Sequence, residues 1–381
     1  QRMNELAVQS ANGTNSSDDR QAIQDEVDQL TTEIDRVAET TKFNEIYLLK
    51  GDNSNTKNVY MKGHDAGLKG TLTDGAKSAT FTMDALQAGD KYTIAGKEYT
   101  IGSATTEVTA LIDKANTDAT ADTANKTVDV NGKTYTITYN AAGNTIADAD
   151  GTAITLDDLK KAVTGGSKVT YGNTSLTAMT DADTDGVDDD DSSIITKDVA
   201  ETKIKAELLT ANNIGTVDQA ATVEDANTAN GKTSYTINKG YATVADTLSF
   251  NLHVGADADM TNKITVDIDT MNSANLGIKG INVKDASGTE ATYAIDAIAD
   301  AVAKVSSQRS ALGAVQNRLE HTIDNLDNIS ENTSSAESRI RDTDMAKEMV
   351  NYSKNNILAQ AGQSMLAQAN QSNQGVLSLL Q

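Results

Sequence analysis

The sequence predicts an α+β protein in which the two ends of the chain form a long α-helical coiled-coil rod. A β-rich region of one or two small domains is inserted between these two ends. Apolar residues recur at spacings of three and four near both ends, as in helices that pack along a partner helix. Residues 51–245 instead show short alternating runs split by Gly and Asn, which is typical of β-hairpins. Proline is absent, so helices can run long without interruption.

The composition excludes several classes of partner. The chain has 381 residues and a formal net charge of -23, and no basic stripe offsets this charge, so nucleic acid would be repelled. No run of about 18 apolar residues could span a bilayer, so no membrane partner is expected. Cysteine is absent, which rules out disulfides and thiolate chemistry. A large negative charge also keeps a secreted protein soluble until it assembles.

The chain starts inside a helical pattern. Met3, Leu6 and Ser10 lie at helical spacing, and no capping residue precedes them. We therefore expect that an N-terminal segment precedes Gln1 in the whole protein and that any export signal lies there. The first helix is predicted to stop at residues 12–13, an Asn-Gly pair.

A second helix follows, and Ser16, Ser17 or Asp18 can cap its first turn. Its apolar residues have spacings of four and three, which is the heptad seam of a helix that needs a partner. Residues 43–49 then predict a strand or extended stretch, which residues 51–53 break. The seam consists of Ile23, Val27, Leu30, Ile34 and Val37.

A loose repeat marks the middle of the chain. Segments 96–101, 132–137 and 231–237 share a Gly-Lys start and a Tyr-Thr-Ile end, and each follows a turn signal. They predict β-hairpins with tight turns. Short helices are predicted to interleave at residues 107–114 and 156–163.

The strongest helical pattern lies after two further predicted strands at residues 248–254 and 264–268. It keeps three/four spacing with Gly313 as its one weak point, and continued to Ile340 it predicts a helix of roughly 45–50 residues, about 70 Å long. A single globular core does not need such a helix, whereas a rod does. Its apolar positions are Ile295, Ile298, Val302, Val305, Leu312, Val315, Leu319, Ile323, Leu326 and Ile329.

The final segment carries no charged side chain after Lys354. Its apolar residues alternate with Gln, Asn and Ser, which predicts an amphipathic helix with an amide-rich polar face. Where identical copies stack, a charge meets its own kind, whereas an amide can donate to and accept from another amide. The alternatives are a solvated tail that folds only on assembly and, less favoured because it lacks basic and aromatic anchors, a membrane-surface helix. The predicted assembly residues are Ile357, Leu358, Met365, Leu366, Leu377 and Leu380.

Several runs of residues resemble one known family. The run Ser-Ser-Gln-Arg-Ser-Ala-Leu-Gly-Ala-Val-Gln-Asn-Arg-Leu-Glu at 306–320 is similar to the C-terminal region of bacterial flagellins, and Gln-Arg-Met-Asn-Glu-Leu-Ala-Val-Gln-Ser-Ala-Asn at 1–12 is similar to their N-terminal rod. Together the matching runs cover about 40% of the chain. The others lie at 33–37, 335–342, 345–349, 355–361, 365–370 and 375–380.

The resemblance implies an arrangement of the chain. Residues 1–50 would form the N-terminal part of the rod, residues 51–245 the variable outer domains, residues 246–340 the C-terminal part of the rod, and residues 341–381 an inner-core helix. The N-terminal inner helix that should pair with residues 341–381 would lie in the preceding segment.

The resemblance also implies a function. The chain would be an extracellular structural subunit that polymerises with other copies into the flagellar filament for motility, and it would be handled by the flagellar export and capping machinery. It would have no cofactor and no enzyme activity. A hook-filament junction protein, or an adhesin-like binding module in residues 51–245, is the alternative from another class.

Flagellins of this type are recognised by the innate immune Toll-like receptor 5. Carried over by position, the resemblance implies a receptor-binding set on the first two helices. Without the resemblance, Leu6 would be interpreted as rod core, and Arg2 and Glu26 as a solvated helix face. The set consists of Gln1, Arg2, Glu5, Leu6 and Glu26.

One acidic loop is similar to a calcium loop. Asp181, Asp183 and Asp185 precede Gly186 at the spacing of the first ligands, but Ser192 stands where a bidentate Glu is expected. A solvated acidic loop is therefore favoured over a calcium site. The three histidines show no metal-type spacing.

Overall fold

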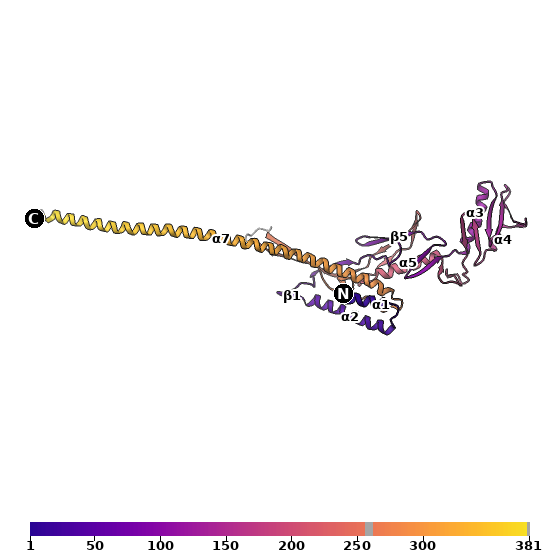
Figure 1. Ribbon diagram of the computed structural model, residues 1–381, viewed down its shortest axis with the longest axis horizontal. Helices are drawn as coiled ribbons and strands as arrows, with labels where there is room; N and C mark the ends of the chain where they lie inside the picture. Colours follow the sequence, from indigo (N-terminus) through magenta and orange to yellow (C-terminus); the bar gives the residue numbers. More distant parts are fainter. Residues whose placement is uncertain (256–261, 379–381) are drawn as a thin grey trace. The chain divides into compact units, whose positions relative to one another are not determined.

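The computed structural model describes residues 1–255 and 262–378 of the chain (Figure 1). They divide into two compact units. The first contains residues 1–248 and 267–308, and the second contains residues 249–255, 262–266 and 309–378.

The helical part of the first unit packs helices from both ends of the chain on one core. Helix α1 (Arg2–Ala11) ends where predicted, with Asn12 as its C-cap. Helix α2 (Ser17–Thr40) starts after Ser16, whose side chain forms a capping box with Asp19. Both pack with the start of α7 (Thr289–Ser378) and with the segment before it. The core consists of Met3, Leu6, Ala7, Ile23, Val27, Leu276, Ile278, Ile281, Val283, Ala291, Ala294, Ile298 and Ala301.

The predicted seam of α2 is buried only in part. Ile23 and Val27 lie in the core, and Leu30 and Ile34 are partly buried against it. Val37 is exposed, and the neighbouring Ala38 is buried instead. The partner helices therefore cover the first turns of α2 more completely than the last ones.

A two-stranded ladder joins this core to the middle of the chain. Strand β3 (Asp52–Tyr60) pairs antiparallel with β18 (Tyr241–Asp246), and α6 (Ser273–Leu276) packs on β18. The chain enters the ladder at Gly51, whose φ is +79°, and a Cβ there would lie 2.2 Å from the Thr270 Oγ1. Only glycine fits that position.

The stretch predicted at 43–49 is not a single strand. It forms a small hairpin of β1 (Lys42–Phe43) and β2 (Ile46–Tyr47), with Asn44 and Glu45 at positive φ in its turn. A tight turn that requires two residues at positive φ was not visible in this sequence, because no glycine marks it.

The middle of the chain contains two further cores. In the first, sheets of order β15-β17-β5-β4 and β14-β7-β6 pack with α5, and β16 pairs with β17. Its buried residues include Phe81, Tyr235 and Leu208. The elements are β4 (Thr71–Asp74), β5 (Ser78–Asp84), β6 (Lys91–Ile94), β7 (Lys97–Ile101), β14 (Ile194–Ile195), α5 (Lys197–Asn212), β15 (Thr222–Val223), β16 (Asn227–Ala229) and β17 (Lys232–Asn238).

The second of these cores lies between a six-stranded sheet and two helices. The sheet order is β11-β10-β9-β8-β12-β13, and its neighbours pair antiparallel. Val128, Ile137 and Val169 of the sheet are buried with Ile112 and Leu159 of the helices. The elements are α3 (Thr105–Ala121), β8 (Lys126–Val130), β9 (Lys133–Thr138), β10 (Thr145–Asp148), β11 (Ala153–Ile154), α4 (Leu156–Lys161), β12 (Lys168–Tyr171) and β13 (Thr174–Thr177).

All three predicted tight turns are present. The pairs at 95–96, 131–132 and 230–231 join β6 to β7, β8 to β9 and β16 to β17, and both residues of each pair have positive φ, as a type I′ turn requires. The predicted short helices are also present as α3 and α4, although α3 is longer than expected. Helix α5 was not predicted, although Ala200, Ile204 and Leu208 have helical spacing.

The second unit contains a hairpin and most of α7. Strand β19 (Leu248–His253) pairs with β20 (Lys263–Ile268), as the alternating pattern predicted. The prediction of a helix that ends near Ile340 is wrong, because α7 continues for 90 residues without a break. No glycine or proline lies between Gly313 and Gly362, and the Arg341–Glu337 ion pair spans one helical turn at the expected end.

We expect that replacing Leu208 with Ala destabilises the core that contains α5. Leu208 is fully buried there, and a leucine-to-alanine cavity costs about 2–5 kcal/mol of unfolding free energy. Urea unfolding followed by near-ultraviolet circular dichroism of the tyrosines measures the loss. The exposed Val217 is the control, because Val217→Ala should change stability by less than about 0.5 kcal/mol. Equal effects of the two changes would contradict the packing of α5.

Candidate functional site

The predicted receptor-binding residues centre on an ion pair between α1 and α2. The Arg2 Nε lies 2.7 Å from Glu26 Oε1, and its Nη2 lies 3.0 Å from Glu26 Oε2. The guanidinium therefore binds the carboxylate with two parallel hydrogen bonds. Glu5, one turn along α1, lies 3.6 Å from the Arg2 Nη1. The three side chains form a charged surface cluster over the α1–α2 contact.

The pair shifts the titration of both partners. The hydrogen bonds from Arg2 lower the pKa of Glu26, and those from Glu26 raise the pKa of Arg2. Both groups are solvated, so the pair contributes little to folding stability. Its consequence is geometric, because it holds both side chains in one orientation at the surface.

Leu6 differs from the other four predicted residues. Its side chain is only 2% exposed and lies in the helical core with Ile23 and Val27, whereas Gln1, Arg2 and Glu5 are exposed. Leu6 therefore lies beneath the surface that a partner would touch, and its part in receptor binding stays a prediction. The periodicity had indicated this, because Leu6 shares helical spacing with Met3 and Ser10.

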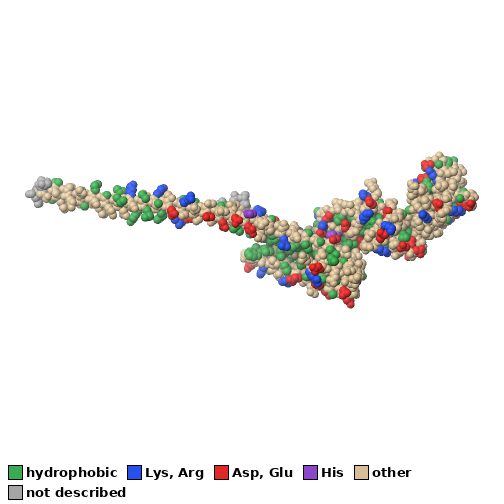
Figure 2. All heavy atoms as spheres, in the orientation of Figure 1, with side chains coloured by type: hydrophobic (Ala, Val, Ile, Leu, Met, Phe, Trp, Pro, Cys, Tyr) green, Lys and Arg blue, Asp and Glu red, His purple; other side chains and the backbone are tan. Residues whose placement is uncertain are grey.

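The predicted assembly residues lie on the C-terminal part of α7, and the described ones are exposed in this single chain. Their exposed fractions lie between 58% and 74%, and Figure 2 shows green apolar side chains spread along this helix. Leu380 lies outside the described residues. The described members are Ile357, Leu358, Met365, Leu366 and Leu377.

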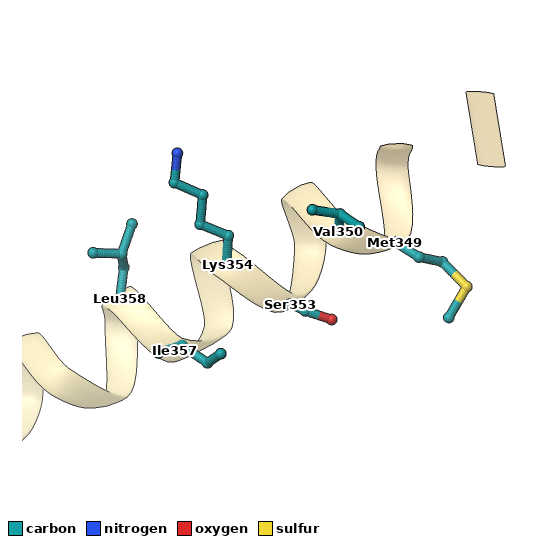
Figure 3. Close-up of a pocket in the computed structure, with 6 residues that line it drawn as sticks. All are labelled: Met349, Val350, Ser353, Lys354, Ile357 and Leu358. Carbon is teal, nitrogen blue, oxygen red and sulfur yellow. The ribbon is translucent and has the colours of Figure 1, made fainter. Parts of the chain in front are cut away.

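The apolar side chains do not follow one stripe along the whole segment. At roughly 100° per residue, Leu358 and Val376 lie on the same side of α7, and Met365 lies close to that side. Met349 precedes Leu358 by nine residues, about two and a half turns, so it points to the opposite side. Figure 3 shows this change of direction between Met349 and Leu358. A helix with apolar side chains on more than one side needs cover on more than one side.

The sequence interpretation overlooked some exposed apolar residues. Met345, Met349, Val350 and Tyr352 lie just before the predicted assembly residues, and all are more than half exposed. They lie among charged residues, so the segment did not stand out as apolar in the sequence. Their own three/four spacing was the available signal. In the first unit, the β1–β2 hairpin exposes Phe43, Ile46 and Tyr47.

The acidic loop brings its three predicted ligands together. Single carboxylate oxygens of Asp181, Asp183 and Asp185 lie within 4.8 Å of one another, and no other such group occurs in the described parts of the chain. The loop also closes on itself, because Asp181 accepts hydrogen bonds from the backbone N–H groups of Asp185 and Gly186, both at 3.1 Å. Calcium binding stays a prediction, and the solvated loop remains its alternative.

The histidines are placed apart from this loop. His64 Nε2 lies 3.4 Å from the Asp300 Oδ2 in the first unit. His321 lines a hollow of the second unit with Arg318 and Lys263. His253 ends strand β19.

The helices of the two chain ends, with β-rich modules inserted between them, define an α+β protein built on long terminal helices, as predicted. No helix within residues 1–255 and 262–378 is apolar over a length that would cross a bilayer. The helices carry two surface features: the exposed apolar side chains on the C-terminal part of α7, and the charged cluster of Arg2, Glu5 and Glu26.

Comparison with known proteins agrees with this class. The bacterial flagellin N-terminal helical region matches residues 1–54, and the bacterial flagellin C-terminal helical region matches residues 295–380. A flagellin of Clostridium tyrobutyricum is 35% identical over 98% of this chain and 77% of that protein. A flagellin of Salmonella rubislaw is 34% identical over 100% of this chain and 82% of that protein.

A solved structure of FliC from Burkholderia pseudomallei is 18% identical and covers 83% of this chain and 92% of that chain, with a TM-score of 0.28. The sequence matches to the two family regions and to the two flagellins show that the chain belongs to the bacterial flagellin family. The family consists of structural subunits of the flagellar filament.

We expect that replacing Arg2 with Ala raises the pKa of Glu26 toward its ordinary value of 4.5, because the lowering comes from the Arg2 hydrogen bonds. The folded-state pKa of Glu26 is lowered, so the pair stabilises the fold above the unfolded-state pKa and is lost as pH falls through the folded-state value. A carboxyl NMR titration measures this. Arg36→Ala is the matched control, since Arg36 pairs with Glu33. A Glu26 pKa unchanged by Arg2→Ala would contradict the pair.

Proposed function

We propose that this chain polymerises with copies of itself into the extracellular flagellar filament and so serves motility. The observation that supports this is the C-terminal part of α7, where large apolar side chains lie exposed in the single chain. No charged residue follows Lys354. Exposed apolar surface on this scale is typical of an interaction site.

The chemistry of this segment supports another copy of the same protein as its partner. Burial of the apolar side chains removes their surface from water, which drives association. Amides between them can pair with amides of another copy, whereas like charges would repel. An open contact of this kind, repeated by a screw operation, produces a filament and not a closed ring.

The remaining roles follow from that proposal. Residues 1–50 and 246–340 form the rod in which α1, α2 and the start of α7 pack. Residues 51–245 are the outer domains, and residues 341–381 form the inner helix. The chain reaches the filament through the flagellar export and capping machinery.

A second part of the proposal is recognition of the unassembled protein by Toll-like receptor 5. The surface is the α1–α2 cluster, where Arg2, Glu5 and Glu26 are solvated and the Arg2–Glu26 pair fixes their orientation. Gln1 adjoins it. Leu6 is buried in the core beneath this surface and supports recognition indirectly, because it holds α1 on α2.

The first prediction concerns assembly. Changing Leu358 and Leu366 together to Glu should raise the critical concentration for polymerisation at least about tenfold, because two charges would be buried without partners. Electron microscopy and sedimentation after a heat-and-cool cycle measure filament yield. The variant with Leu358→Met and Leu366→Met should assemble better than the Glu pair. Val217→Glu is the control for added negative charge, because it places a Glu on the first unit and outside the proposed assembly surface. Normal filaments from the Glu pair would refute the assembly surface.

The second prediction concerns recognition. Changing Arg2 and Glu26 together to Ala should raise the protein concentration for half-maximal receptor signalling about tenfold, as loss of a central interface pair does. A reporter cell line that carries the receptor measures it. The matched control is Arg36→Ala with Glu33→Ala, which removes a similar ion pair farther along α2. Equal responses of the two variants would count against this surface.

A further inference from the structure

The methionines of this chain divide into two groups by exposure. The chain has nine of them. Met3, Met61, Met83 and Met179 belong to packed cores and are at most 7% exposed. Three others are at least 59% exposed, and all of them lie on the C-terminal part of α7: Met345, Met349 and Met365. Met271 is partly buried, and Met260 lies outside the described residues.

Exposure decides which thioethers react with a two-electron oxidant. The sulfur lone pair attacks one oxygen of a peroxide, the O–O bond breaks, and with hydrogen peroxide the other oxygen leaves as water. The product is methionine sulfoxide, in which the sulfur has gained one oxygen atom and lost two electrons to the peroxide. A buried thioether cannot be approached in this way until its core opens. The three α7 methionines are already exposed, so a peroxide can reach their sulfur atoms without the opening of a core.

We propose that Met345, Met349 and Met365 form an oxidation site through which peroxides block assembly of the free subunit. The inference rests on the proposed function, because it requires that this part of α7 is buried between copies. The oxidant is identified by its chemistry as a small peroxide, with hydrogen peroxide as the probe.

The chemical change is large where these residues lie. A thioether is a flexible apolar group, whereas a sulfoxide is polar and carries a strong acceptor oxygen. Burial of that oxygen without a donor costs free energy. Met365 lies between Ser364 and Leu366, and after Lys354 the segment has no cation that could pair with the sulfoxide oxygen. One subunit would carry three such groups into its contacts.

Position on the helix strengthens the effect. Met345 and Met349 are four residues apart and share one side of α7, while Met365 lies on the side of Leu358. Met349 also lines the hollow with Val350 and Ile357 that Figure 3 shows. Oxidation therefore makes two sides of the helix polar, and a subunit cannot avoid the damage by turning one side outward.

The same argument predicts protection in the filament. Once copies cover the three thioethers, they should oxidise as slowly as the buried four. Oxidation would then act on subunits before assembly and leave finished filaments intact.

The experiment exposes the unassembled chain to hydrogen peroxide, removes the peroxide with catalase, and maps sulfoxides by peptide mass spectrometry as gains of about 16 Da. The three α7 methionines should oxidise at least about tenfold faster than Met3, Met61, Met83 and Met179. Polymerisation is then compared with the untreated sample of the same protein. We expect the critical concentration of the oxidised chain to rise at least about fivefold, and methionine sulfoxide reductases to reverse the change.

Two variants separate this site from general damage. In one, Met345, Met349 and Met365 are changed together to Leu, and the ratio of treated to untreated assembly should then stay near one. In the other, Met61, Met83 and Met179 are changed to Leu, and that protein should remain as sensitive as the natural chain. Full assembly of an oxidised natural chain, or equal sensitivity of both variants, would overturn the inference. If the untreated protein, tested with both of its terminal helices intact, forms no filaments at all, the proposed function fails and the inference fails with it.

Discussion

The structure depends on how far the chain can cover the apolar side of α7 by itself. Up to Ala301, α1, α2 and the segment from Leu276 to Val283 cover that side. Beyond it, Val302, Ile323 and the large apolar residues from Ile340 to Leu377 are exposed to a considerable degree. Burial of apolar surface is the main favourable term in folding and association. The chain covers α7 closely only at its start, and farther along Leu312, Val315, Leu319 and Leu326 are half-buried. The exposed apolar residues of the helix therefore call for further copies.

The covered part is fixed by specific hydrogen bonds as well as by packing. The Gln24 side chain accepts from the Val283 backbone N–H at 2.7 Å and donates to the Ile281 carbonyl at 2.9 Å, and both bonds are buried. Asp35 accepts from the backbone N–H of Ser273 at 2.7 Å. These contacts join α2 to residues more than two hundred positions away. They make the helical core a property of both chain ends together.

The middle modules have their own cores and join the helical core through the β3–β18 ladder. The start of α7 also reaches the core that contains α5, where the Tyr293 hydroxyl donates to the Glu207 carboxylate of α5 at 2.7 Å, and burial, together with this bond, raises the pKa of Tyr293. The hydroxyl therefore stays a donor at physiological pH.

The sequence by itself determined the features that are local. Tight turns at Asn131-Gly132 and Asn230-Gly231 follow from backbone φ preferences, and the start of α2 follows from the hydrogen bonds of Ser16. Only the tertiary structure decided which apolar positions are covered. Leu6 and Met365 both fit helical patterns, yet one is buried by α2 and the other has no cover in the chain. A spacing of three and four tells which side of a helix is apolar, whereas burial depends on which distant segments reach that side, and no local pattern contains that information.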